Sequence, residues 1–264
     1  MREVFKMWGN TRMVVLVAIS AAVYAAVLIP FKAIQIVPGL AEIRPAAALP
    51  PLCSLLFGPA GAWGAAFGNL IGDFFGMLGP GTIFGFIGNF LYGYIPYKVW
   101  EIFSINHSEK KVIARSPWTW VRLESGFLLA SVSCGMFIGW GLDLLGIVPF
   151  KVLGNIICIQ NCLVSMIISP FLVFLFYPMI QNWGLSYQDI LDDESYSKPQ
   201  GHGRQTLRIL GLVLILLGAV GGLIIGNLVS FGVIDLSAML GAAASIRWVL
   251  LPFILLILCG CVML

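Results

Sequence analysis

Residues 13–31 read MVVLVAISAAVYAAVLIPF, an apolar run without a charge between Arg12 and Lys32. About 20 residues of α-helix cross the hydrocarbon core of a bilayer, so this run predicts a transmembrane helix. Further charge-free intervals include residues 74–97, 125–142, 152–188 and 209–234. The 264-residue chain is 59% hydrophobic and 10% charged, whereas soluble domains are about one-quarter charged. The sequence therefore predicts an all-α, polytopic transmembrane helical bundle.

Eight spans are expected along the chain. They cover approximately residues 12–31, 45–58, 60–79, 82–103, 123–142, 150–178, 207–230 and 246–264. The second is short and contains Pro45, Pro50 and Pro51, so it cannot be one regular helix. The sixth is too long for a perpendicular span, which predicts a tilt or an extension beyond the membrane.

The distribution of basic residues predicts the orientation. With the amino terminus in the cytoplasm, that side carries eleven Lys and Arg residues, and the outer side carries only Lys32, Arg44, Lys151 and Arg247. This asymmetry follows the positive-inside rule. We expect a multi-pass protein of the cell membrane with both termini in the cytoplasm. The start, MREVFKMWGNTR, leads into a run of full spanning length, which favours a retained first span over a cleaved signal peptide.

One strongly polar stretch divides the chain. Residues 181–206 hold a cluster of acidic residues and then KPQGHGR, which predicts a cytoplasmic linker. The expected organisation is a six-span substrate-binding core (1–180), this linker and a two-span C-terminal appendix (207–264). His107 and His202 fall in cytoplasmic loops without a partner at metal-ligand spacing, so no metal or other cofactor is expected.

Small residues recur on the first span. Ala18, Ala22 and Ala26 are spaced four apart, and such a stripe lets another helix approach closely. The stripe is explained equally well by packing inside the bundle and by contact with another subunit.

The third span carries a second stripe of small residues, and the fourth continues it. The glycines concerned are Gly64, Gly68, Gly72, Gly76, Gly81, Gly85 and Gly93. We expect these helices to touch the backbones of their neighbours.

Polar residues within spans indicate a site. Asn69 and Asp73 lie four apart on the third span, and an ionisable residue in a membrane usually faces a cavity or a partner. Glu42 and Arg44 precede the proline-broken span in AEIRPAAALPP, residues 41–51. Irregular backbone at membrane depth is found where protein or a wet cavity satisfies it. Two interpretations are equally compatible with the sequence: Arg44 pairs with Asp73 as a structural bridge, or either residue holds an anionic or amine group of a ligand.

Four further polar or aromatic side chains are candidates for the same pocket. Asn89 lies in register with the glycines of the fourth span, and Trp140, Asn155 and Gln160 lie in the outer halves of the fifth and sixth. For Trp140, anchoring at the membrane interface is the slightly preferred explanation. Asn155 and Gln160 are explained equally by hydrogen bonds between helices.

Motifs of enzymes and ATPases are missing from the sequence. It contains no GxxxxGK[ST] phosphate loop, no HExxH and no GxSxG. We therefore expect neither ATP hydrolysis by this chain nor a catalytic residue, and nothing in the sequence suggests nucleic-acid binding.

The alanine stripe, the short second span ending LLFGPAGAWGA (55–65) and the third span ending GDFFG (72–76) form a loose pattern in a six-span unit. In these features, residues 1 to about 180 resemble the substrate-binding (S) components of energy-coupling factor (ECF) vitamin transporters. The phrase LFGP (56–59), followed by a glycine-rich helix with an acidic residue, is especially similar. The last two spans depart from the pattern of this family.

The resemblance implies a subunit that captures a vitamin or cofactor precursor in an outward pocket. It would dock on a transmembrane scaffold subunit, which carries two cytoplasmic ATPase subunits, and topple to release its cargo. Ala18 and Ala22 would face the scaffold. The pocket would include Glu42, Arg44, Asn89, Trp140 and Asn155. The chain lacks the Met-His start of the cobalt and nickel members, so a metal substrate is not expected.

Two other functions are compatible with the sequence. A stand-alone secondary transporter of a small organic solute could use Asp73 as a proton carrier, and ATP-dependent uptake would exclude it. A membrane enzyme or assembly factor is the third possibility, and turnover of a substrate would favour it.

Overall fold

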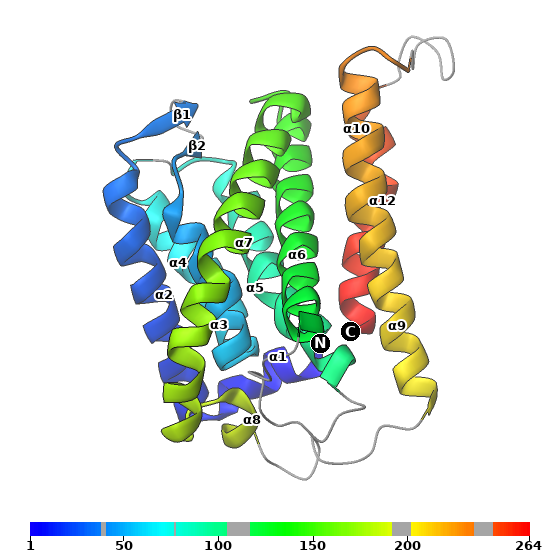
Figure 1. Cartoon of the computed structure of the whole chain (residues 1–264). Helices are drawn as coiled ribbons and strands as arrows, with labels where there is room; N and C mark the ends of the chain where they lie inside the picture. Colours follow the sequence, from blue (N-terminus) through cyan, green and yellow to red (C-terminus); the bar gives the residue numbers. More distant parts are fainter. Residues whose placement is uncertain (38–40, 77, 105–116, 192–201, 235–244) are drawn as a thin grey trace.

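The computed structural model describes residues 1–37, 41–76, 78–104, 117–191, 202–234 and 245–264. These residues are almost entirely helical, as predicted, with one two-stranded sheet (Figure 1). The elements of the N-terminal part, which we call the core, are α1 (Arg2–Lys6), η1 (Met7–Gly9), α2 (Thr11–Phe31), β1 (Gln35–Val37), β2 (Ala41–Glu42), η2 (Pro45–Ala48), α3 (Leu49–Phe57), α4 (Pro59–Asp73), α5 (Thr82–Ser104), α6 (Pro117–Leu144), α7 (Phe150–Asn182) and α8 (Tyr187–Ile190). The C-terminal elements are α9 (His202–Leu216), η3 (Leu217–Gly221), α10 (Gly222–Ser230) and α12 (Ile246–Met263).

Helices occupy all eight positions where spans are predicted. Within the described residues, five helices are long and apolar enough to cross a membrane, which confirms the polytopic helical bundle. Helix α7 contains 33 residues, about 50 Å at 1.5 Å per residue. It therefore exceeds the hydrocarbon core of about 30 Å, as expected for the sixth span.

The second predicted span is broken where its prolines and one glycine lie. Pro45 begins the short η2, and Pro50 and Pro51 lie in the first turn of α3, where a missing N–H is tolerated. Gly58 then has φ +52°, a backbone region that glycine enters readily, and Pro59 begins α4. The chain thus turns sharply between α3 and α4, and the two helices pack against each other.

The glycine stripe of α4 lies against α2. A Cβ added to Gly64 would lie 2.3 Å from the Cβ of Ser20, and one added to Gly68 would lie 2.9 Å from the carbonyl oxygen of Ala21. The predicted close contact of backbones is therefore present between these two helices. Ala21 and Ala25 are buried in this contact.

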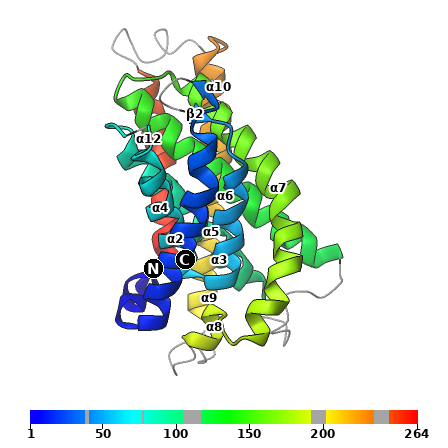
Figure 2. The same ribbon diagram turned by 90° about the vertical axis from the view of Figure 1, so that its left-hand side faces the viewer.

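The other face of α2 carries the predicted alanine stripe. Ala18, Ala22 and Ala26 are exposed on the surface of this chain. Helix α2 lies on the side of the bundle away from α9, α10 and α12, so the C-terminal helices leave this face uncovered (Figures 1 and 2). The stripe therefore does not pack inside the bundle.

The C-terminal helices form a pair that packs on the core. Helix α12 contacts α9 and η3, and the pair contacts α6 and α7. Polar side chains join it to the core at different levels: Tyr94 Oη donates to the Cys261 carbonyl at 3.0 Å, and the amides of Asn155 and Asn227 exchange hydrogen bonds of 2.6 and 3.0 Å.

The two termini lie at the same end of the bundle, and the β1–β2 hairpin lies at the opposite end (Figure 1). Near the termini, α1 crosses the bundle and is fastened by Trp63, whose Nε1 donates to the Val4 carbonyl at 2.9 Å. The hairpin is antiparallel and pairs Gln35 with Glu42. The two ends of the bundle therefore differ, and the hairpin end holds the cavity described next.

Candidate functional site

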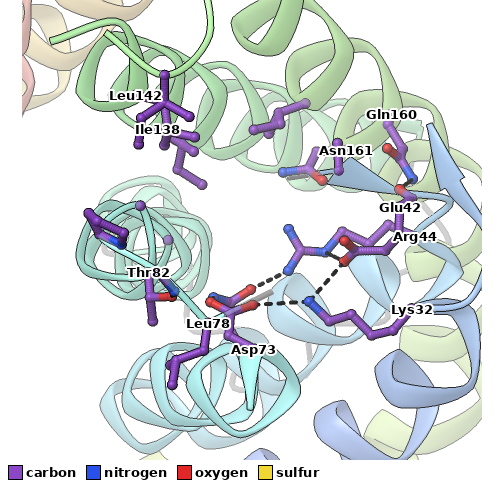
Figure 3. A pocket seen from close by; sticks show the side chains of 18 residues that line it. Lys32, Glu42, Arg44, Asp73, Leu78, Thr82, Ile138, Leu142, Gln160 and Asn161 are labelled. Atoms are coloured by element: carbon purple, nitrogen blue, oxygen red, sulfur yellow. Dashed lines mark hydrogen bonds and ion pairs between the residues drawn. The ribbon is translucent and has the colours of Figure 1, made fainter. Parts of the chain in front are cut away.

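A cavity of ≈ 190 Å³ opens at the hairpin end of the bundle. This volume is smaller than that of most ligand pockets, which measure about 300–1,000 Å³. Its walls come from the end of α2, the hairpin and the segments α4 to α7 (Figure 3). The lining residues include Lys32, Glu42, Arg44, Asn69, Asp73, Thr82, Gly85, Ile138, Leu142, Ile157, Gln160 and Asn161.

Four charged side chains meet on one wall of this cavity. Lys32 Nζ lies 3.0 Å from Asp73 Oδ1 and 3.6 Å from Glu42 Oε1. Arg44 Nε lies 3.1 Å from the same Glu42 oxygen. Lys32, Glu42 and Asp73 are all less than 10% exposed, so these charges are balanced by one another rather than by bulk water. We call these four residues the charged cluster.

Asn69 connects the two halves of the charged cluster. Its Oδ1 accepts a short hydrogen bond from Arg44, and its Nδ2 donates to Asp73 Oδ2 at 3.2 Å. Residues four apart on a helix lie on one face, which explains why Asn69 and Asp73 reach the cavity together. One buried amide thus satisfies both a cation and a carboxylate.

Local structure fixes the position of each charge. Lys32 caps the C-terminus of α2, where a cation is favoured by the helix dipole. Glu42 lies in β2, and Arg44 lies between the hairpin and η2. Gln160 of α7 donates from Nε2 to the carbonyl oxygen of Glu42 at 3.0 Å, which fastens the hairpin over the cavity.

The wall opposite the charged cluster is apolar. Ile138 and Leu142 project from α6 on the far side of the cavity from Arg44 and Lys32 (Figure 3). Ile157 of α7 adds to this surface. The cavity is therefore suited to a small solute with one apolar side and one polar side.

Five of the eight predicted ligand-binding residues line the cavity: Glu42, Arg44, Asn69, Asp73 and Gln160. They come from three separate segments of the chain, and the structure brings them together.

The other three predicted residues lie elsewhere. Asn89 is 1% exposed and accepts a hydrogen bond from Tyr24 Oη at 2.9 Å. Trp140 Nε1 donates to the Arg247 carbonyl at 2.9 Å, and Asn155 pairs with Asn227. None of these three residues is among those that line the cavity. Trp140 and Asn155 instead join the core to the C-terminal helices.

The ion pair expected between Arg44 and Asp73 is replaced by another arrangement. Asp73 pairs with Lys32, and Arg44 pairs with Glu42 and Asn69. The sequence analysis counted Lys32 among the outer basic residues. Nothing in the sequence indicated that the Lys32 side chain reaches Asp73 on α4. Asn161 was also missed, although it follows the predicted Gln160 directly.

The part of the chain that contains the cavity is similar to a known protein family. A family profile described as QueT transporter matches residues 14–178, more than half of the sequence. The chain belongs to the QueT transporter family. QueT proteins are S components of the ECF type, so the predicted resemblance is confirmed. No curated protein and no solved structure matches the chain.

The QueT match includes the whole cavity wall and ends within α7. The charged cluster, the alanine stripe and Gln160 all lie inside it. The C-terminal helices α9, α10 and α12 lie outside it, in agreement with the departure seen in the sequence. The membrane-embedded substrate-binding role of the family thus falls on the part of the chain that contains the cavity.

Proposed function

We propose that this chain captures a queuosine precursor at the cell surface and delivers it to an ATP-driven ECF transporter. The observation that supports this most directly is the cavity at the end of the bundle opposite the termini. It lies within the region matched by the QueT family, whose S components serve queuosine precursor uptake. With the termini in the cytoplasm, the cavity opens outward.

The charged cluster and Asn69 supply polar groups to the solute in this proposal. Lys32 and Arg44 donate hydrogen bonds, and Glu42 and Asp73 accept them. Because the four charges already balance, the solute does not need a net charge to bind. The apolar surface of Ile138 lies across the cavity from these groups.

The binding step can be tested on the purified, detergent-solubilised protein. We expect isothermal titration calorimetry with a queuosine precursor to show saturable binding, and thiamine and biotin to show none. Binding of either vitamin in place of the precursor would contradict the assigned substrate.

Docking on a transmembrane scaffold subunit with two ATPase subunits belongs to the same proposal. The exposed Ala18, Ala22 and Ala26 leave a shallow face on α2 that another helix can approach closely. This face lies on the side of the bundle away from the C-terminal helices (Figures 1 and 2).

Replacing Ala22 by tryptophan is expected to abolish uptake in cells while leaving binding by the purified protein unchanged. The bulky ring would keep the scaffold away, but Ala22 is not among the residues that line the cavity. Ala21→Trp is the matched control, because Ala21 is buried against α4 and its replacement should reduce folding and binding together. Loss of binding in Ala22→Trp would contradict the interface.

The orientation gives a further prediction. Lys110 and Lys111 lie outside the described residues, and so do residues 192–201 of the 181–206 linker. In a variant without the six native cysteines, a cysteine at position 110 or 184 should react with an impermeant reagent only after the cells are permeabilised. A cysteine replacing the exposed Lys151 should react on intact cells. The opposite pattern would invert the topology.

A stand-alone proton-coupled transporter with Asp73 as the proton carrier is the alternative. Uptake into vesicles that hold this chain alone, driven by an imposed pH gradient without ATP, would favour it. In the ECF proposal the same vesicles bind the solute but do not accumulate it.

A further inference from the structure

One buried amide beside the cavity has an unused donor. Asn161 of α7 is 1% exposed, and its Nδ2 has no oxygen or nitrogen acceptor among the described residues. The Asn161 side chain hydrogen-bonds the thiol of Cys134, but sulfur is a weak acceptor and takes at most one of the two N–H donors of the amide. Burying an amide donor without an acceptor is unfavourable, and native proteins contain few such groups.

The position of Asn161 gives its donor a direction. Ile157, Gln160 and Asn161 share one face of α7 and line the cavity. Gln160 is committed to the Glu42 carbonyl, whereas the Asn161 side chain points into the open space between the charged cluster and the apolar wall of α6 (Figure 3). The donor is thus presented to whatever occupies the cavity.

The backbone carbonyl of Asn161 is held by a hydrogen bond, which fixes the position from which the side chain projects. Tyr92 Oη donates to the Ala47 carbonyl at 2.8 Å and to the Asn161 carbonyl at 3.3 Å. Tyr92 itself is fully buried. This arrangement fixes α7 relative to the η2 segment and preorganises the amide.

We propose that Asn161 is a specificity-determining residue whose Nδ2 donates a hydrogen bond to an acceptor of the transported solute, either a carbonyl oxygen or an unprotonated ring nitrogen. This inference rests on the proposed function, because it takes the cavity to be the solute site. The solute then places its apolar face against Ile138 and Leu142. A site with a buried donor strongly rejects analogues that lack the matching acceptor.

Two substitutions separate the role of the donor from that of shape. Asn161→Leu has a similar size and no polar atom, and Asn161→Asp has the same shape but offers acceptors in place of the donor. We expect Asn161→Leu to weaken binding of a queuosine precursor by about 10- to 100-fold, the effect of one lost hydrogen bond to a buried partner. Asn161→Asp should weaken it more, because an acceptor then faces an acceptor.

Ser165→Ala is the matched control. Ser165 is fully buried one turn further along α7 and does not line the cavity. Its hydroxyl lies 3.2 Å from that of Ser131, which keeps its own bond to the Phe127 carbonyl. It also hydrogen-bonds Tyr92, whose Oη keeps its bond to the Ala47 carbonyl without it. We expect this variant to bind as the wild type does. Wild-type affinity in Asn161→Leu, or equal losses in Asn161→Leu and Ser165→Ala, would overturn the inference.

Melting of the ligand-free protein gives a readout that needs no solute. A buried donor that waits for a ligand lowers the stability of the ligand-free protein. The Asn161→Leu variant should therefore have a Tm equal to that of the wild type or higher. A clear drop in Tm would show that Asn161 is satisfied internally and would overturn its role. If the wild type binds no queuosine precursor, the assigned substrate fails, and this melting result still decides whether the amide is unused.

Discussion

The protein with Lys32→Met is expected to be much less stable than the wild type. Lys32 is the cation that Asp73 and Glu42 share, at 3.0 and 3.6 Å, and all three side chains are buried. Removing one partner from a buried ion pair typically costs about 3–5 kcal/mol, because the remaining charge loses its compensation. Thermal unfolding in one detergent, at a fixed concentration and without solute, measures the effect.

Asp73→Asn is the matched variant. Asparagine has the same shape, and Lys32 keeps Glu42 at 3.6 Å, so the stability loss should be clearly smaller. Since Asp73 faces the solute in the proposed function, affinity should fall by about 1–3 kcal/mol, as for other unsatisfied buried groups. A stability loss without an affinity loss would leave Asp73 as a structural partner only.

The double variant Lys32→Met/Asp73→Asn completes a double-mutant cycle, which measures the interaction between the two residues. Glu42 retains Arg44 at 3.1 Å in this protein, so most of the loss caused by Lys32→Met should be recovered. Additive losses would show that the two residues do not interact and would contradict the pairing seen in the structure.

The second large effect is expected at the opposite end of the bundle. Lys98 of α5 is 1% exposed and forms ion pairs with Glu3 of α1 and with Glu101, the latter at 2.9 Å. Burial, the largest single influence, would raise the pKa of Glu3. The charge and hydrogen bond of Lys98, together with the amino-terminal charge and a backbone hydrogen bond, outweigh it and leave that pKa below its ordinary value of 4.5. Lys98→Met should therefore destabilise the protein by about 3–5 kcal/mol.

Arg208→Met is the control for this site. Arg208 of α9 reaches Glu101 at 3.8 Å, but Glu101 keeps Lys98, so we expect a loss of no more than about 1 kcal/mol. Equal losses in the two variants would contradict the central role of Lys98. In the wild type, the contribution of Glu3 is present above pH 4.5 and is lost as the pH falls through its lowered pKa.

The arrangement of the spans could be predicted from the sequence because the bilayer imposes a length on every helix. Charge-free intervals and prolines locate the helices, including the break before α4. The glycine stripe also predicted its close contact correctly, since only small residues allow it. Which face of α2 packs inside was not predictable, because alanines occur on both faces, with Ala21 buried and Ala22 exposed.

The candidate site was predicted in part. Glu42, Arg44, Asn69, Asp73 and Gln160 line one cavity because charged groups within a membrane must meet partners or a wet space. The pairing within it depends on how the chain turns after α2, and a sequence does not encode this in any periodic pattern.

Trp140 and Asn155 show a different limit of sequence reasoning. Both are polar or aromatic positions near the ends of their helices on the hairpin side of the bundle, as a residue of this cavity would be. The residues that hold them, Arg247 and Asn227, belong to C-terminal helices whose position against α6 and α7 depends on tertiary packing.

The balance of the charged cluster has an electrical consequence. Lys32, Glu42, Arg44 and Asp73 together carry no net charge when all four are ionised. Moving one elementary charge through a membrane voltage of 100 mV involves about 2.3 kcal/mol, but a neutral group of charges that moves together does no net work against the field. In the proposed function, the charged cluster therefore adds no voltage dependence of its own when the loaded subunit changes orientation. A charge on the solute would add one.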